Sequence, residues 1–185
     1  MEIKITKTTA PKQKPQDESK LGFGRVMTDH MFLMNYNAGQ GWHDARIVPY
    51  GPLELDPSSM VLHYAQEVFE GLKAYRWADG SVHLFRPEEN ARRMQRSNER
   101  MCIPAIAEED FVQAVKTLVK LDQDWVPHQE GTSLYIRPFV FATDAHLGVH
   151  ASQSYLFCII LSPSGSYYPN GIDPVDIYVE SHDVR

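Results

Sequence analysis

Residues 63–97 read HYAQEVFEGLKAYRWADGSVHLFRPEENARRMQRS, and the pattern of this stretch changes three times along its length. It begins with helical spacing, breaks at Gly71, alternates on both sides of Asp79 and Gly80, and enters a second helical pattern at Pro87. An Asp-Gly pair adopts the positive φ of a tight hairpin turn at little cost, and a proline in the first turn of a helix lacks an N–H that would need a partner. The stretch therefore predicts the end of one helix, a β-hairpin and the start of a second helix.

The segments on either side of this stretch complete an α+β pattern. Helices are expected over residues 59–69, 87–101 and 108–125, and strands over residues 30–37, 45–53, 72–77, 81–85, 133–142, 153–162 and 174–181. Strands are followed by a pair of helices and then by further strands. This order predicts a mainly antiparallel sheet with helices packed on one side.

The composition is that of an ordinary globular protein, with 185 residues that are 43% hydrophobic and 23% charged. The net charge of -6 argues against a general nucleic-acid binder, and no apolar stretch reaches the ~20 residues needed to cross a bilayer. The N-terminus lacks the apolar core of a signal peptide. Cys102 and Cys158 form no CxxC motif, which favours a reduced, cytoplasmic protein.

The helix expected from Pro87 is crowded with arginine, and two interpretations of it remain open. Its arginines are Arg92, Arg93, Arg96 and Arg100. They could form a solvated face paired with nearby glutamates. Alternatively, one of them turns inward and holds an anion, such as phosphate, through two parallel hydrogen bonds. Arg93 is the best placed for this role because it lies beside Met94 on the apolar stripe.

The strand GTSLYIRPFVF places Tyr135 and Arg137 on one face, opposite Leu134 and Ile136. The pair could lie on the surface of an edge strand. Pro138 prevents a ladder bond and is consistent with a strand that bends or borders a site. Alternatively, the pair forms a pocket wall in which Arg137 binds a carboxylate and Tyr135 provides shape and a hydroxyl.

Two loops also contain candidate residues. Tyr167 and Tyr168 lie in SPSGSYYPNG, where loop aromatics either bind a ligand or cover the sheet. His146 and His150 have a spacing compatible with metal binding, but no third ligand lies nearby in the sequence, so no metal site is expected.

Seven motifs occur in one order between about Leu21 and Arg185: FGRVMTDHMF, LHYAQEVFEGLKAYR, HLFRPEENARRM, DWVP, GTSLYIRPF, LGVHAS and ILSPSGSYY. In these motifs the chain resembles the N-terminal half of a branched-chain amino acid aminotransferase. The resemblance implies a homodimeric enzyme of fold-type IV that uses pyridoxal 5'-phosphate. Such an enzyme transfers the amino group of leucine, isoleucine or valine to 2-oxoglutarate, with glutamate as product.

The resemblance also implies a division of the chain into segments. Residues 21–168 would be the small N-terminal domain, residues 169–181 an interdomain linker or strand, and residues 182–185 the start of a larger domain. Residues 1–20 lie before the resemblance and are expected to be a flexible arm, because residues 8–20 are rich in Lys, Pro, Gln, Asp and Ser. The lysine that holds the cofactor would follow Arg185. The 185 residues alone are therefore expected to hold no pyridoxal phosphate and to be inactive.

Roles for individual residues follow from the resemblance, by position. Arg93 would bind the cofactor phosphate, and Arg185 would lie close to the cofactor. Arg137 would bind the distal carboxylate of glutamate. The apolar substrate pocket would be walled by Phe23, Tyr64, Phe69, Tyr135 and Tyr167. A loop containing Leu147, Gly148 and Val149 would reach the site of the neighbouring subunit.

Two other functions remain as alternatives. One is a different fold-type IV enzyme, either a D-amino-acid aminotransferase or an aminodeoxychorismate lyase. The motif TDHMF and the pairing of Arg137 with Tyr135 argue against it. The other is a binding module without catalysis. A piece of a larger enzyme should expose a large apolar patch, and an evolved module should not.

Overall fold

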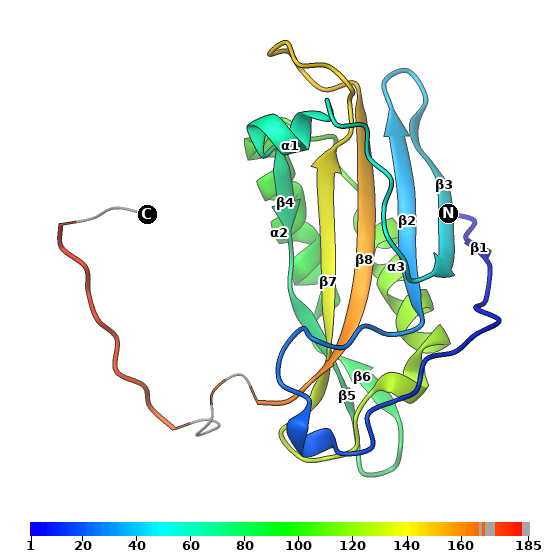
Figure 1. The fold of residues 1–185 in the computed structure, drawn as a ribbon, viewed down its shortest axis with the longest axis vertical. Helices are drawn as coiled ribbons and strands as arrows, with labels where there is room; N and C mark the ends of the chain where they lie inside the picture. The colour runs from blue at the N-terminus through cyan, green and yellow to red at the C-terminus, as the bar shows by residue number, and fades with distance from the viewer. Residues whose placement is uncertain (167, 169–172, 183–185) are drawn as a thin grey trace.

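The computed structural model describes residues 1–166, 168 and 173–182, and these form one eight-stranded sheet with helices against it (Figure 1). In sheet order the strands are β1 (Lys4–Ile5), β3 (Gly41–Pro49), β2 (His30–Asn37), β8 (Ser154–Ser164), β7 (Ser133–Ala142), β5 (Leu72–Arg76) and β6 (Val82–Leu84). The short strand β4 (Glu67–Phe69) pairs with β7 beyond the end of β5. Among the described strands, β1 and β3 form the only parallel pair.

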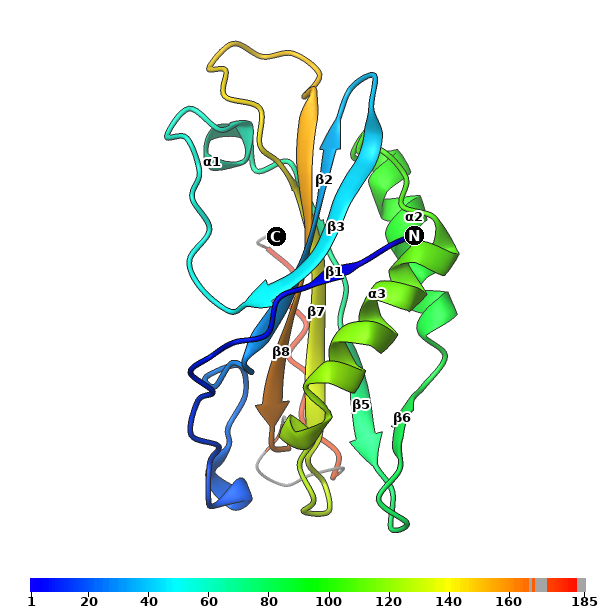
Figure 2. The ribbon, with the colours of Figure 1, turned by 90° about the vertical axis from the view of Figure 1, so that its right-hand side faces the viewer.

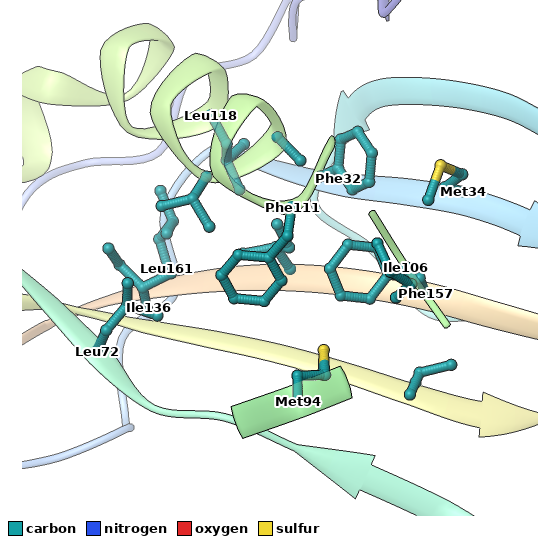
Figure 3. Close-up of a cluster of buried hydrophobic side chains, with 14 of the residues drawn as sticks. Phe32, Met34, Leu72, Met94, Ile106, Phe111, Leu118, Ile136, Phe157 and Leu161 are labelled. Carbon is teal, nitrogen blue, oxygen red and sulfur yellow. The ribbon is translucent and has the colours of Figure 1, made fainter. Parts of the chain in front are cut away.

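Two helices, α2 (Pro87–Arg100) and α3 (Glu108–Leu121), cover one face of the sheet (Figure 2). Their apolar residues recur at helical spacing, so each helix buries one stripe. That stripe and the facing side chains of the sheet form the main core (Figure 3). Its largest members include Phe32, Met94, Phe111, Leu118 and Phe157. The predicted α+β class is confirmed, and the two long helices pack on one side of the sheet as expected (Figure 2).

The opposite face of the sheet carries a smaller cluster, formed by Met31, Leu33, Phe141, Leu156 and Cys158. The short helix α1 (Met60–Tyr64) lies on this side of the sheet in Figure 2. Burial in this cluster raises the pKa of the Cys158 thiol. Further along the same face of β7, the side chains of Tyr135 and Arg137 are only half-buried. The confirmed alternation of β7 therefore directs these two polar side chains away from the main core.

The helix expected over residues 59–69 is too long. Helix α1 ends at Tyr64 because Ala65 adopts a left-handed conformation with φ of 51°, and strand β4 begins at Glu67. In β4 the side chain of Val68 is buried and that of Phe69 is exposed, as alternation requires. Apolar residues in a run this short fit helical and strand spacing equally well, so spacing alone could not separate the two.

Three other boundaries differ from the expectation. The strand expected over residues 45–53 begins earlier, since β3 spans Gly41–Pro49. The helix expected to reach residue 125 ends at Leu121 and is followed by a separate 3-10 turn, Gln123–Trp125. The expected strand over residues 174–181 is wrong, because the described residues 173–182 form no strand and extend away from the sheet (Figure 1). An alternating pattern forms a strand only where a neighbouring strand completes its hydrogen bonds.

Residues 1–20, the expected arm, make specific contacts with the rest of the chain. The Lys12 ammonium donates to the carbonyl oxygens of Met27 and Thr28, and the amide of Thr8 donates to His30 Nε2 at 2.9 Å. The His30 ring in turn contacts the buried Asp122 carboxylate, with 2.6 Å between Nδ1 and Oδ1. The mobility of this arm stays a prediction, but its first half runs along the sheet.

Candidate active site

The link Phe69–Glu70–Gly71 joins β4 to β5 and lies opposite Pro138 of β7. The amide of Glu70 donates to the Pro138 carbonyl at 2.8 Å. A full antiparallel pair would exchange two such bonds, but Pro138 has no N–H to return one. The chain can therefore leave β7 at Glu70 and rejoin it as β5. Since β8 pairs with the other side of β7, the edge-strand interpretation of Tyr135 and Arg137 is wrong.

Arg93 of α2 makes a two-pronged ion pair with Glu70. Nε of Arg93 lies 2.7 Å from Oε1 of Glu70, and Nη2 lies 2.7 Å from Oε2. The Glu70 side chain is 2% exposed and also accepts a hydrogen bond from Asn90, whereas the Arg93 side chain is 60% exposed. These bonds to Glu70 raise the pKa of Arg93 and keep its guanidinium charged. One edge of the guanidinium is thus fixed by a buried carboxylate, and the other edge is presented to solvent.

Arg93 lines a shallow hollow together with two further arginines. Its lining residues are Phe85, Arg86, Glu89, Asn90, Arg93 and Arg96. Arg92, by contrast, lies outside this hollow and pairs with Glu89 at 2.6 Å and Glu108 at 3.0 Å. The helix therefore combines both interpretations of its arginines. Arg92 belongs to a solvated, paired face, and Arg93 keeps free N–H groups suited to an oxyanion.

Four of the residues expected at the substrate pocket lie together on the other side of the link. The rings of Phe23 and Tyr135 meet edge to face with centroids 4.8 Å apart. Arg137 donates to the Tyr135 hydroxyl from Nε at 3.1 Å and from Nη2 at 2.7 Å, and its guanidinium lies 4.3 Å from the Phe69 ring centroid. The hollow beside them, about 180 Å³, also contacts Met27 and Ile160. Complete ligand pockets span about 300–1,000 Å³, so these residues form part of a wall.

Gly71 allows the Tyr135 ring to approach the link. A Cβ atom at this position would lie 2.5 Å from the Tyr135 hydroxyl oxygen and 3.2 Å from the adjacent ring carbon. We expect Gly71→Ala to push the tyrosine away from Arg137 and to lower the free energy of unfolding by about 1–3 kcal/mol. Urea unfolding measures this change. Gly51→Ala is the matched control, because nothing lies within 4 Å of its Cβ position. Equal stability of both variants would contradict the tight approach.

The expected subunit-contact loop lies near Tyr64. The Tyr64 hydroxyl donates to the Leu147 carbonyl, which joins the end of α1 to the loop. The side chains of Leu147 and Val149 are 60% and 84% exposed. The loop thus presents apolar side chains outward, while its role in a subunit contact stays a prediction. Two further expected site residues, Tyr167 and Arg185, lie outside the described residues.

The two loop histidines contact each other and Asp144. His150 donates from Nδ1 to the Gly148 carbonyl at 2.8 Å and from Nε2 to Asp144 at 3.1 Å, with His146 Nδ1 lying 2.9 Å from His150 Nδ1. Only the protonated ring can donate from both nitrogens, so these bonds raise the pKa of His150. A hydrogen bond from the Gln153 amide lowers the pKa of Asp144, and the hydrogen bond and charge of His150 lower it further. Among the described residues, no group of three or more metal-ligand side chains is suited to hold a metal ion.

These two shifts predict a pH window in which the loop is most stable. The Asp144 contribution is complete above its ordinary pKa of 3.8 and is lost as pH falls through its lowered folded-state pKa. The His150 contribution is complete below its ordinary pKa of 6.5 and is lost as pH rises through its raised folded-state pKa. Corrected amide exchange of Gln153 should therefore be slowest between these values. Asp144→Asn should flatten the profile and His83→Gln should not, whereas a flat wild-type profile would contradict the assignment.

Glu70 and Asn90 were not identified as candidates from the sequence. Glu70 lies two residues after Val68 and two before Leu72, so in an extended segment the three side chains point to the same face. The side chains of Val68 and Leu72 are both buried. A carboxylate on this buried face requires a partner, because an unpaired buried charge is costly. Alternation in VFEGL therefore contained the signal that could have identified Glu70.

Curated relatives match almost the whole chain. A branched-chain-amino-acid aminotransferase of Bacillus subtilis is 57% identical over 183 residues, which cover 99% of this chain and 50% of the relative. One from Mycolicibacterium smegmatis is 48% identical over 189 residues, covering 100% of this chain and 51% of the relative. The chain thus spans about half the length of the curated relatives it matches. No family model matches it.

Solved structures share the fold. A branched-chain amino acid aminotransferase of Escherichia coli aligns with a TM-score of 0.59 and 23% identity, over 75% of this chain and 41% of that one. A branched-chain aminotransferase of Thermoproteus uzoniensis, solved with norvaline, aligns with a TM-score of 0.56 and 24% identity, over 75% of this chain and 43% of that one. In the part of this chain that the structure describes, no helix has the length and apolarity needed to cross a membrane.

Proposed function

Because this chain belongs to the branched-chain aminotransferase family and corresponds to the N-terminal half of its relatives, we propose that it supplies the small domain of a pyridoxal-phosphate-dependent transaminase. Its substrates would be leucine, isoleucine or valine, with 2-oxoglutarate as the amino acceptor. The observation that carries the proposal is the placement of two arginines, Arg93 and Arg137, on opposite sides of one short link. One arginine suits a phosphate and the other a carboxylate beside apolar rings.

The residues around Arg93 fit the phosphate of the cofactor. Arg93 retains three of its five N–H groups after pairing with Glu70, and Arg86 and Arg96 line the same hollow. When bound, the cofactor supplies an electron sink for the bond that breaks at the substrate's α carbon. In this proposal the task of Arg93 is to anchor and orient the phosphate end.

Arg137 explains how one pocket could accept both an apolar and an acidic substrate. Its guanidinium lies against the Phe69 ring and donates two hydrogen bonds to the Tyr135 hydroxyl, so it is held without an acidic partner among the described residues. With a branched side chain in the pocket, these rings provide apolar contact. With 2-oxoglutarate, the remaining N–H groups of Arg137 would bind the distal carboxylate in charge-assisted hydrogen bonds.

We further propose a cytoplasmic homodimer. The free cysteines Cys102 and Cys158 suit a reducing compartment, and the exposed Leu147 and Val149 suit a loop that a second subunit covers. The dimer is tested by sedimentation of a longer protein, one that contains this chain together with a second half like that of its relatives. A Val149→Glu variant should shift the equilibrium toward monomer, and a purely monomeric wild-type protein would contradict this part of the proposal.

The decisive experiment uses a protein that contains this chain together with a second half like that of its relatives. It is incubated with pyridoxal phosphate, reduced with borohydride and mapped by mass spectrometry. A single modified lysine beyond Arg185, together with leucine-dependent formation of glutamate from 2-oxoglutarate, is expected. The 185-residue chain, treated in parallel, should give no specific adduct and no turnover. Absence of both results from the longer protein would overturn the proposal.

A further inference from the structure

Glu70 is a buried carboxylate whose position depends on α2. Its side chain is 2% exposed and accepts three hydrogen bonds from that helix, two from Arg93 and one from Asn90. Its backbone amide is bonded to Pro138 of the central strand β7 at 2.8 Å. The backbone of Glu70 is therefore bonded to the sheet and its carboxylate to the helix.

The geometry of this pair determines which N–H groups of Arg93 remain available. The bonds from Nε and Nη2 occupy one complete edge of the guanidinium plane. The N–H groups of Nη1 and the second N–H of Nη2 are left, and the arginine side chain is 60% exposed. Without Glu70, a long arginine side chain at this exposure would sample several rotamers, at an entropic cost when it binds a ligand.

We propose that Glu70 is a positioning residue, which holds Arg93 so that its unused N–H groups are directed at the cofactor phosphate. The inference rests on the proposed function, because it takes Arg93 as the phosphate ligand. Glu70 would touch neither the cofactor nor the substrate. It would act by reducing the freedom of Arg93 before the phosphate arrives, which is preorganisation of a binding group.

Glu70→Gln in the longer protein tests this role, because glutamine keeps the size of the side chain and removes its charge. Affinity is measured for pyridoxal 5'-phosphate and, separately, for pyridoxal, which lacks the phosphate. We expect about a 10-fold loss for the phosphorylated compound and less than about a 2-fold change for pyridoxal. Glu70→Asp keeps the carboxylate and should retain part of the affinity. Glu108→Gln is the matched control, since Glu108 pairs with Arg92, an arginine of the same helix that lies outside the hollow.

A second measurement separates positioning from general support of the fold. In an Arg93→Ala background, Glu70→Gln should produce no further loss of pyridoxal phosphate affinity, because the residue acts only through Arg93. Equal losses for both compounds, or additive losses in the double variant, would overturn the proposal. If Glu70→Gln does not fold, the same comparison with Glu70→Asp decides. A wild-type protein that binds neither compound would instead overturn the proposed function.

Discussion

Replacing Arg93 by alanine is expected to weaken pyridoxal phosphate binding by the longer protein about 100-fold. The variant loses charge-assisted hydrogen bonds to the phosphate, which together contribute about 3 kcal/mol. It also leaves the Glu70 carboxylate, 2% exposed, without its cationic partner. Stability should therefore fall as well, by about 1–3 kcal/mol.

The measurement is the equilibrium retention of the cofactor by dialysis, with urea unfolding of the same samples. Arg100→Ala is the control, because Arg100 lies on the same helix and is exposed but does not line the hollow. We expect that control to change affinity by less than about 3-fold. Unchanged affinity in Arg93→Ala would remove Arg93 from the phosphate site.

Replacing Arg137 by leucine is expected to slow the half-reaction with 2-oxoglutarate about 100-fold, while the half-reaction with leucine changes by less than about 5-fold. The distal carboxylate loses its charged partner, whereas an apolar side chain still meets Phe69 and Tyr135. The leucine reaction is not fully spared, because Arg137 also holds the Tyr135 hydroxyl through two hydrogen bonds.

Single-turnover kinetics of each half-reaction give the two rates separately. Arg137→Lys serves as the matched variant, since it keeps the charge and loses the planar two-pronged geometry, and it should give an intermediate loss for 2-oxoglutarate. Equal losses in the two half-reactions would rule out Arg137 as the group that binds the distal carboxylate.

Strand and helix patterns predicted the framework of the site well because they depend on burial. Alternation in GTSLYIRPF placed Tyr135 and Arg137 on one face, as the structure has them. The early end of α1 could not be predicted in this way, because Ala65 adopts φ of 51° and alanine carries no signal for a left-handed conformation. The expected strand over residues 174–181 failed for a different reason, since pairing depends on a partner strand that a local pattern does not reveal.

Several residues that the resemblance assigns to the site lie far apart in the sequence, and the folded chain brings Phe23, Phe69, Tyr135 and Arg137 together. Arg93 and Arg137 are 44 positions apart, yet both contact the link between β4 and β5. Glu70 carried no assigned role. Its importance arises from a contact with a residue 23 positions away, which spacing within either segment cannot predict.

The two arginine contacts of the link constrain the number of residues in this part of the chain. Consecutive side chains of an extended segment point to opposite faces, so Phe69 reaches the Arg137 side of the sheet and Glu70 reaches the Arg93 side. Inserting or deleting one residue just before Phe69 would exchange the two directions and remove both arginine contacts in a single step. Substitution can therefore vary the bulk of Phe69 beside Arg137, but the length of the segment has to stay fixed.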